Sequence, residues 1–189
     1  VAVWHMADLN DSAGKNSSLT ITRDVTVGVA LEGADREESL ERGGDGLAGE
    51  FRGGYLSARQ GAEGELNLGG KAMSMCLRFR LAQGISDTPL FSKHGGHEGL
   101  VYNLFWTRLG SQVSLGFEMG TDWSQRPLRL SVPATMIGPS LWHDAVVRFD
   151  DAKLEMFVDG VLVDEEWPIG SLQQGNVEPC LIGAESQGG

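Results

Sequence analysis

The chain has 189 residues, a length that suits one domain because two-sheet β proteins often reach this size as a single unit. Hydrophobic residues make up 41% of it, and 27 glycines against 6 prolines are typical of short strands joined by tight turns. The formal net charge of −11 repels phosphate backbones and anionic bilayers. Nucleic acid and membrane surfaces are therefore disfavoured as partners, whereas neutral sugars, cations and basic proteins are compatible with the charge.

Short strands are predicted along most of the chain. In order, they cover residues 1–6, 19–22, 54–58, 73–81, 89–92, 102–106, 113–119, 128–132 and 180–183. The clearest is 73–81, where apolar residues alternate with polar or charged ones, as on a strand with one buried face. Residues 34–42 are short, charged and followed by a glycine-rich stretch, so a loop or a single helical turn is expected there.

The most specific pattern is a three-stranded meander within residues 141–167. Residues 142–149 are rich in valine and aromatic residues, and a second strand follows over 154–158. Asp159-Gly160 then predicts a tight hairpin, because a type I′ turn needs positive φ at both central positions. The third strand runs from 161 to 167, and Pro168 ends it. Many short strands with regular turns predict an all-β fold of two stacked antiparallel sheets.

This meander carries a family resemblance. Residues 141–149 (LWHDAVVRF) and 154–160 (LEMFVDG) resemble the W-H-x-V and L-x-L-Y-V-D-G runs of laminin G-like and concanavalin A-like modules. Similar stretches lie upstream in the family's order, at residues 11–16, 51–56, 66–68 and 89–93. The resemblance implies a two-sheet antiparallel jelly-roll sandwich that spans residues 1–189 as one concanavalin A-like domain.

Residues 163–168 (VDEEWP) narrow the resemblance to the lectin-like modules fused to bacterial glycoside hydrolases, especially the fructan-active enzymes of family 32. Such modules usually finish with one more strand than this sequence contains. The resemblance therefore implies a segment of a longer protein that lacks its closing strand, with an oligo- or polysaccharide and the catalytic domain of the same parent chain as partners. The compartment stays open, with an extracellular location favoured.

The carboxylates argue against catalysis by this segment. The resemblance brings in glucanases, which place a Glu-x-Asp-x-(x)-Glu run along one strand so that the acids face a single cleft. This sequence has no such run. In Asp164-Glu165-Glu166 only Asp164 and Glu166 can share a face, and a solvated acidic edge is the simpler interpretation.

Two polar loops are the candidate glycan-binding elements. His94, His97 and Glu98 lie in a glycine-rich segment that is a turn, a sugar-contacting loop or, as a third alternative, a zinc site. Trp123 lies among polar residues and is either exposed for sugar stacking or a cover over the edge of the core. Trp142 and Trp167 are predicted to pack in the core, because both fall in strand patterns.

The remaining chemistry concerns calcium and thiols. Asp8, Asn10 and Asp11 offer oxygen ligands, but they lack the glycine and glutamate positions of an EF-hand loop, so a plain turn is the alternative. The resemblance implies that a structural calcium is a possible cofactor at these residues. Cys76 and Cys180 both lie in strand-like stretches and are either two buried thiols or one disulfide.

Three functions follow from these patterns. The leading hypothesis is a non-catalytic carbohydrate-binding or accessory module of a glycoside hydrolase. The alternative is a laminin G-like structural or protein-interaction domain, and the third is a stand-alone hydrolase. An exposed tryptophan over a polar groove favours the first, a large flat apolar face the second, and two facing carboxylates in a cleft the third.

Overall fold

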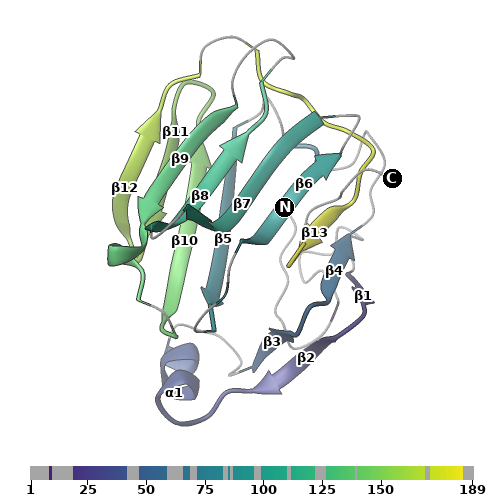
Figure 1. Cartoon of the computed structure of the whole chain (residues 1–189), viewed down its shortest axis with the longest axis vertical. Helices are drawn as coiled ribbons and strands as arrows, with labels where there is room; N and C mark the ends of the chain where they lie inside the picture. The colour runs from purple at the N-terminus through teal and green to yellow at the C-terminus, as the bar shows by residue number, and fades with distance from the viewer. Residues whose placement is uncertain are drawn as a thin grey trace.

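Two antiparallel β-sheets stack face to face in the computed structural model of the chain (Figure 1). The structure describes residues 9, 19–41, 47–58, 66–68, 72–82, 85, 87–95, 99–109, 112–121, 127–138, 140–168 and 171–184. Every pairing between neighbouring strands of these residues is antiparallel. This is the two-sheet jelly-roll sandwich of the concanavalin A-like type that the sequence predicted. Within the described ranges, no helix has the length and apolar character needed to span a membrane.

The larger sheet has seven strands in the order β1-β4-β13-β6-β7-β8-β9. Their bounds are β1 (Thr20–Thr22), β4 (Tyr55–Ala58), β13 (Cys180–Ile182), β6 (Thr88–Gly95), β7 (Gly99–Leu109), β8 (Gln112–Met119) and β9 (Leu128–Pro133). The C-terminal strand β13 inserts between β4 and β6, so residues far apart in the sequence lie side by side.

The smaller sheet has four strands in the order β12-β11-β10-β5. They are β5 (Met73–Arg80), β10 (Trp142–Phe149), β11 (Leu154–Val158) and β12 (Val161–Glu166). A separate hairpin joins β2 (Val25–Ala30) to β3 (Leu47–Phe51), with helix α1 (Gly33–Glu41) between them, and a short 3-10 helix, η1 (Ala134–Met136), follows β9.

The core lies between the two sheets and is built from alternate residues of each strand. On the larger sheet, Leu104, Phe117 and Leu130 pair across β7, β8 and β9 and are almost completely buried. Val147 and Met156 face them from the smaller sheet and are equally buried. This period of two leaves the other residue of each pair on an outer face of the sandwich, where binding groups can be presented.

The meander predicted from residues 141–167 is confirmed. β11 and β12 are adjacent antiparallel strands, with Val158 opposite Val161. The turn residues Asp159 and Gly160 have φ values of 50° and 80°, as a type I′ hairpin requires. The alternation of β5 is confirmed as well, with Met73, Met75 and Phe79 buried.

Three features differ from the sequence prediction. The segment expected to be a loop or one turn is the nine-residue helix α1, which the Arg80 guanidinium tethers by donating to Asp35 Oδ2 at 2.5 Å. Strands β2 and β3 were not predicted, because β2 shows no clean alternation of buried and exposed residues. β6 and β7 extend well beyond their predicted ends, since backbone pairing continues into the glycines Gly95 and Gly99. The strand predicted at 1–6 lies outside the described residues.

Candidate functional site

The residues predicted to bind glycan lie only partly within the described structure. His94 lies near the end of β6 and is half-buried. His97, Glu98 and Trp123 are outside the described residues, so the predicted loop site stays a prediction. The strand ends that bracket the two loops do lie at one end of the larger sheet, because Tyr102 in β7 pairs with Met119 in β8.

The predicted calcium ligands Asp8, Asn10 and Asp11 also lie outside the described residues. Among the residues that the structure does describe, no group of three or more histidine, cysteine, aspartate or glutamate side chains could hold a metal ion. The calcium site therefore stays a prediction.

The two acidic residues that share a face on β12 are committed to a structural role. Asp164 Oδ2 accepts a hydrogen bond from the Ser131 amide at 2.9 Å, and Glu166 Oε2 accepts one from the Arg129 amide at 2.8 Å. Both amides belong to β9, the last strand of the larger sheet. The carboxylates therefore cover the polar backbone of that edge strand, a common means of preventing edge-to-edge pairing.

A second polar pair, His143 and Asp159, has the residue types of a catalytic pair but connects two segments of the backbone. His143 is buried; its Nδ1 lies 2.8 Å from Asp159 Oδ2 and its Nε2 lies 3.1 Å from the Gly138 carbonyl oxygen. Asp159 Oδ1 accepts a further bond from the Asp144 amide. These contacts join the β11–β12 turn to the start of β10, and they leave both ring nitrogens occupied.

An exposed aromatic residue marks the outer face of the four-stranded sheet. Trp167 follows β12 and has 58% of its surface exposed, which corrects the prediction that it packs in the core. The Lys153 ammonium lies 5.8 Å from the centre of the indole ring. An exposed aromatic ring beside a cation offers a large apolar surface and a charged group to a ligand, a combination that is typical of binding sites.

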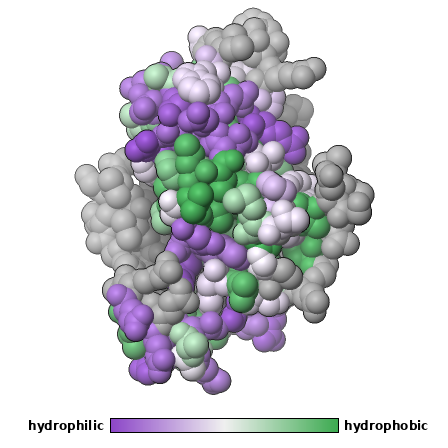
Figure 2. All heavy atoms as spheres, turned by 90° about the vertical axis from the view of Figure 1, so that its left-hand side faces the viewer, coloured by the Kyte–Doolittle hydropathy of each residue, from purple (hydrophilic) through white to green (hydrophobic). Residues whose placement is uncertain are grey.

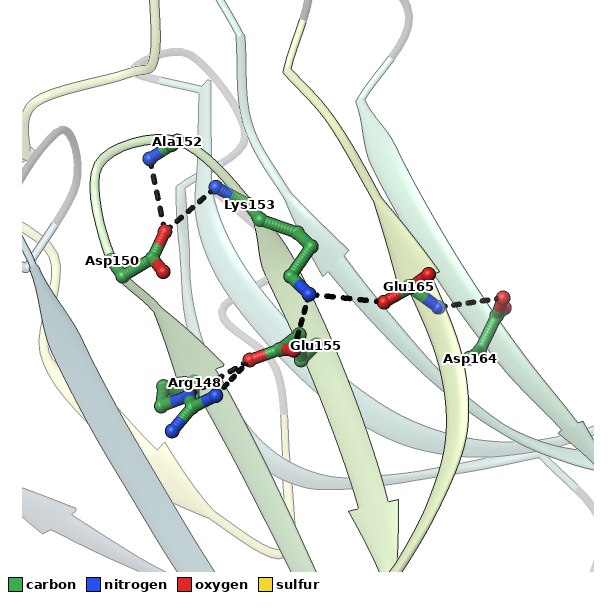
Figure 3. Close-up of polar contacts among 7 residues, drawn as sticks. All are labelled: Arg148, Asp150, Ala152, Lys153, Glu155, Asp164 and Glu165. Atoms are coloured by element: carbon green, nitrogen blue, oxygen red, sulfur yellow. Dashed lines mark hydrogen bonds and ion pairs between the residues drawn. The ribbon is translucent and has the colours of Figure 1, made fainter.

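Four charged side chains form a network (Figure 3), and one of them, Lys153, is the cation that lies against the Trp167 ring. Lys153 Nζ lies 2.6 Å from Glu155 Oε1 and 3.1 Å from Glu165 Oε2, so it bridges strands β11 and β12. Arg148, on β10, donates to Glu155 through Nε at 2.8 Å and through a second guanidinium nitrogen. Lysine and arginine thus hold Glu155 from two sides, which fixes its orientation.

The neighbouring turn positions Lys153. Asp150 Oδ1 accepts hydrogen bonds from the amides of Lys153 at 2.9 Å and Ala152 at 3.1 Å (Figure 3). Asp151, within this turn, has a positive φ of 72°. The Asp150 amide in turn donates to the Lys153 carbonyl oxygen at 3.3 Å, so a side-chain cap and a backbone bond together hold the segment that carries Lys153 into the network.

The pKa values of the network follow from these contacts. Hydrogen bonds from Lys153 and then Arg148 lower the pKa of Glu155, and hydrogen bonds to Glu155 and then Glu165 raise the pKa of Lys153. The two amides of the turn lower the pKa of Asp150. Glu155, Lys153 and Asp150 are therefore all charged at neutral pH.

Two further aromatic rings on the same face also lie against cations. Phe157, on β11, has the Arg148 guanidinium 5.7 Å from its ring centre. Trp142, at the start of β10, has Arg78 at 5.7 Å and Arg80 at 5.0 Å. Trp142 shares its face with these arginines because it pairs directly with Arg80, so it lies on the outer face and not in the core as predicted.

Apolar side chains accompany the charged groups on this side of the molecule. Figure 2 shows hydrophobic residues gathered in the middle of the side that carries β12, with hydrophilic residues above and below them. The exposed apolar residues of β12 are Val161 (58% exposed) and Leu162 (44%). Leu162 pairs with Phe157, so the patch continues onto β11.

The two cysteines differ in environment. Cys180 is buried in β13, and burial raises its pKa to about 12. Cys76 is exposed on the outer face of β5, which corrects the interpretation as two buried thiols. Partial desolvation by its neighbours, and then the negative charge of Asp144, raise the pKa of the Cys76 thiol. Both are free thiols on different sheets, so the disulfide alternative is wrong.

Sequence reasoning missed the Trp167 site, although a signal for it exists. Trp167 comes two positions after Glu165, and residues two apart on a strand share a face. Glu165, flanked by two further acids, is expected to face the solvent, and Trp167 is then expected on the same face. Lys153 and Glu155 carried no comparable signal, because their contacts depend on the register between β11 and β12.

Comparison with known proteins shows the fold. No protein-family model matches the sequence, and no curated protein matches it. Among solved structures, the chain is similar to the binding domain of Paraclostridial Mosquitocidal Protein 1, with a TM-score of 0.63 at 13% identity over 98% of this chain and 43% of that one.

The chain is also similar to domain 4 of AbnA, an extracellular family 43 arabinanase from Geobacillus stearothermophilus, solved in complex with arabinotriose. The TM-score is 0.59 at 17% identity, over 94% of this chain and 79% of that one. A third similar structure is the binding domain of Botulinum Neurotoxin DC in complex with SialylT, with a TM-score of 0.58 at 10% identity over 92% and 40% of the two chains.

Proposed function

We propose that the chain is a carbohydrate-binding accessory module of a glycoside hydrolase. The observation that carries this proposal is the exposed Trp167 indole beside the charged network of Lys153, Glu155 and Glu165. Sugars have apolar faces of C–H groups that stack on aromatic rings, and their hydroxyls need hydrogen-bond partners. The site offers both kinds of contact within one surface.

The charged groups suit hydroxyl recognition because they are already oriented. Glu155, whose side chain is only 5% exposed, holds Lys153 and Arg148 in place from beneath. The more exposed Lys153, Arg148 and Glu165 side chains are the groups open to hydroxyls, and they need not be ordered when a ligand binds. Ordering a long side chain at an interface costs on the order of 1 kcal/mol. A preorganised network avoids that cost, as binding sites on rigid strands do.

The solved structures support the proposal through the ligands with which two of them were solved. Domain 4 of the arabinanase was solved with arabinotriose, and the neurotoxin binding domain with SialylT. We extend the proposal to a parent enzyme that acts on plant-type polysaccharides, with fructan-active family 32 enzymes as the first candidates on the sequence resemblance. The loops with His94, His97, Glu98 and Trp123 are proposed as a second contact area.

The proposal includes no hydrolysis by this chain. The two carboxylates of β12 that share a face, Asp164 and Glu166, are hydrogen-bonded to the backbone of β9. A nucleophile or acid must instead reach a glycosidic bond. We expect no release of reducing sugars from fructan, β-glucan or arabinan. Turnover that the Glu166→Gln variant abolishes would contradict this part of the proposal.

The test is binding of the chain to a panel of polysaccharides, measured by affinity electrophoresis and calorimetry. Arabinan, inulin and barley β-glucan are the probes. Trp167→Ala should weaken binding to the retained polymer at least about tenfold, the loss expected of one aromatic anchor. The matched control is Val177→Ala, which removes a side chain of similar exposure (53%) elsewhere. Equal affinity of the Trp167→Ala variant and the wild type would contradict the proposal.

A second candidate function, protein interaction of the laminin G type, is favoured by the apolar patch of Val161 and Leu162 (Figure 2). Exposed apolar patches mark protein interfaces when they are large and contiguous. On β12 this patch exposes only these two apolar side chains, so the carbohydrate function takes precedence. A Leu162→Glu variant that keeps full polysaccharide affinity but loses self-association or capture by the parent's catalytic domain would support the second candidate.

A further inference from the structure

Three aromatic residues on the outer face of the four-stranded sheet follow one line. Trp142 lies four residues before Val146, which pairs with Phe157. Phe157 lies four residues after Lys153, whose ammonium is 5.8 Å from the Trp167 ring. Each step from one ring to the next therefore crosses one strand and covers four residues along it.

The pleat converts these steps into distances. Four residues of an antiparallel strand span about 13 Å, and adjacent strands are about 4.8 Å apart. The two steps together separate the positions of Trp142 and Trp167 by about 28 Å along a diagonal of the sheet. Phe157 lies near the middle of that line. We name the set Trp142, Phe157 and Trp167 the aromatic strip.

Cations accompany every ring of the strip, and each has a carboxylate partner. Beside Trp142, Arg80 pairs with Asp35 at 2.5 Å and Arg78 with Asp144 at 3.9 Å. Beside Phe157, Arg148 pairs with Glu155. Beside Trp167, Lys153 pairs with Glu155 and Glu165. The strip therefore presents hydrogen-bonding groups without a surplus of positive charge.

We infer that the aromatic strip binds a neutral polysaccharide along its chain, with successive parts of one polymer stacked on Trp142, Phe157 and Trp167. The inference rests on the proposed function and names the ligand class of the same face. A trisaccharide is too short to reach both tryptophans, so only a longer chain uses the whole strip. An acidic polymer is disfavoured, because the cations are already paired and the chain carries a net charge of −11.

The experiment measures affinity against chain length for the polymer retained best among arabinan, inulin and barley β-glucan. The ligands are its trisaccharide, its decasaccharide and the polymer itself, with polygalacturonate as the acidic comparison. The variants are Trp167→Ala, Trp142→Ala and Trp142→Leu, of which the last keeps the site filled if alanine unfolds the strand. Val177→Ala serves as the matched control, and urea unfolding checks that each variant is folded.

The expected result is a decasaccharide bound at least about tenfold more tightly than the trisaccharide, and a loss of about tenfold in decasaccharide affinity for each tryptophan variant. Polygalacturonate should bind more weakly than the neutral polymer. Equal affinities for the two chain lengths, or a Trp142→Leu variant with unchanged decasaccharide affinity, would overturn the strip while the Trp167 site stood. Tighter binding of polygalacturonate would overturn the neutral-ligand assignment. Absence of binding to every glycan would instead refute the proposed function.

Discussion

Replacing Asp164 tests the account of the β12 carboxylates, because both of its oxygens accept backbone hydrogen bonds. Oδ2 accepts from the Ser131 amide at 2.9 Å and Oδ1 from the Glu165 amide at 2.9 Å. Asp164→Ala removes both bonds, whereas Asp164→Asn keeps one acceptor oxygen. Asp164→Ala should therefore lose more stability than Asp164→Asn.

The magnitude follows from the exposure of these bonds. A hydrogen bond to a charged group contributes about 1.5–3 kcal/mol to stability when buried, and water can replace much of it at a surface. Both bonds are exposed, so we take about 1 kcal/mol for each. The free energy of unfolding should fall by about 2 kcal/mol in Asp164→Ala and by about 1 kcal/mol in Asp164→Asn.

Urea denaturation gives both values, because the midpoint shifts while the slope stays constant if only stability changes. The Ala variant also uncovers the Ser131 amide on β9, so light scattering should show stronger self-association at high concentration. A midpoint unchanged in Asp164→Ala would refute the structural role. Equal losses in the two variants would show that the charge, and not the acceptors, is what matters.

Three other expectations follow from single contacts. The pKa of Glu155 is lowered in the folded state, so its contribution to stability is fully present above its unfolded pKa of about 4.3 and is lost as the pH falls through the lowered folded value. The pKa of Lys153 is raised in the folded state, so its contribution is fully present below its unfolded pKa of about 10.4 and is lost as the pH rises through the raised folded value. Thermal unfolding should therefore show a plateau between about pH 5 and pH 10, and a decline that starts at pH 7 would contradict it. One of the 2 cysteines, Cys76, should react with Ellman's reagent in the native protein and both in denaturant; a native count of two would place Cys180 at the surface. Gly116→Ala should cost about 1–3 kcal/mol, because the new Cβ would lie 2.6 Å from Phe105 Cζ, and an unchanged urea midpoint would show that the ring moves freely.

The fold was predictable because local signals and global architecture agree. Strict alternation identifies β5 from the sequence, and the Asp159-Gly160 pair identifies the β11–β12 hairpin in the same way. Helix α1 was missed because its nine residues have little intrinsic stability, and the Asp35–Arg80 ion pair that tethers it joins positions 45 residues apart.

The candidate site was predictable to a much smaller degree. Trp167 was assigned to the core because a tryptophan in a strand is usually buried, whereas its face is set by the register of β12 against β11. The network around Glu155 brings together three strands, and no spacing in one strand encodes it. The aromatic strip has the same origin, since its three residues align only after the strands pair.

The most direct test of carbohydrate binding on this face is an NMR titration with the retained polysaccharide. A ¹H–¹⁵N spectrum resolves the indole N–H signals of the 5 tryptophans, and each is followed as the ligand is added. We expect the signals of Trp167 and Trp142 to shift as binding saturates, while that of Trp106, buried in the core, stays fixed. A shift confined to Trp123 would move the site to the predicted loops. Unchanged signals from Trp167 and Trp142 at a ligand concentration that saturates binding would contradict the account.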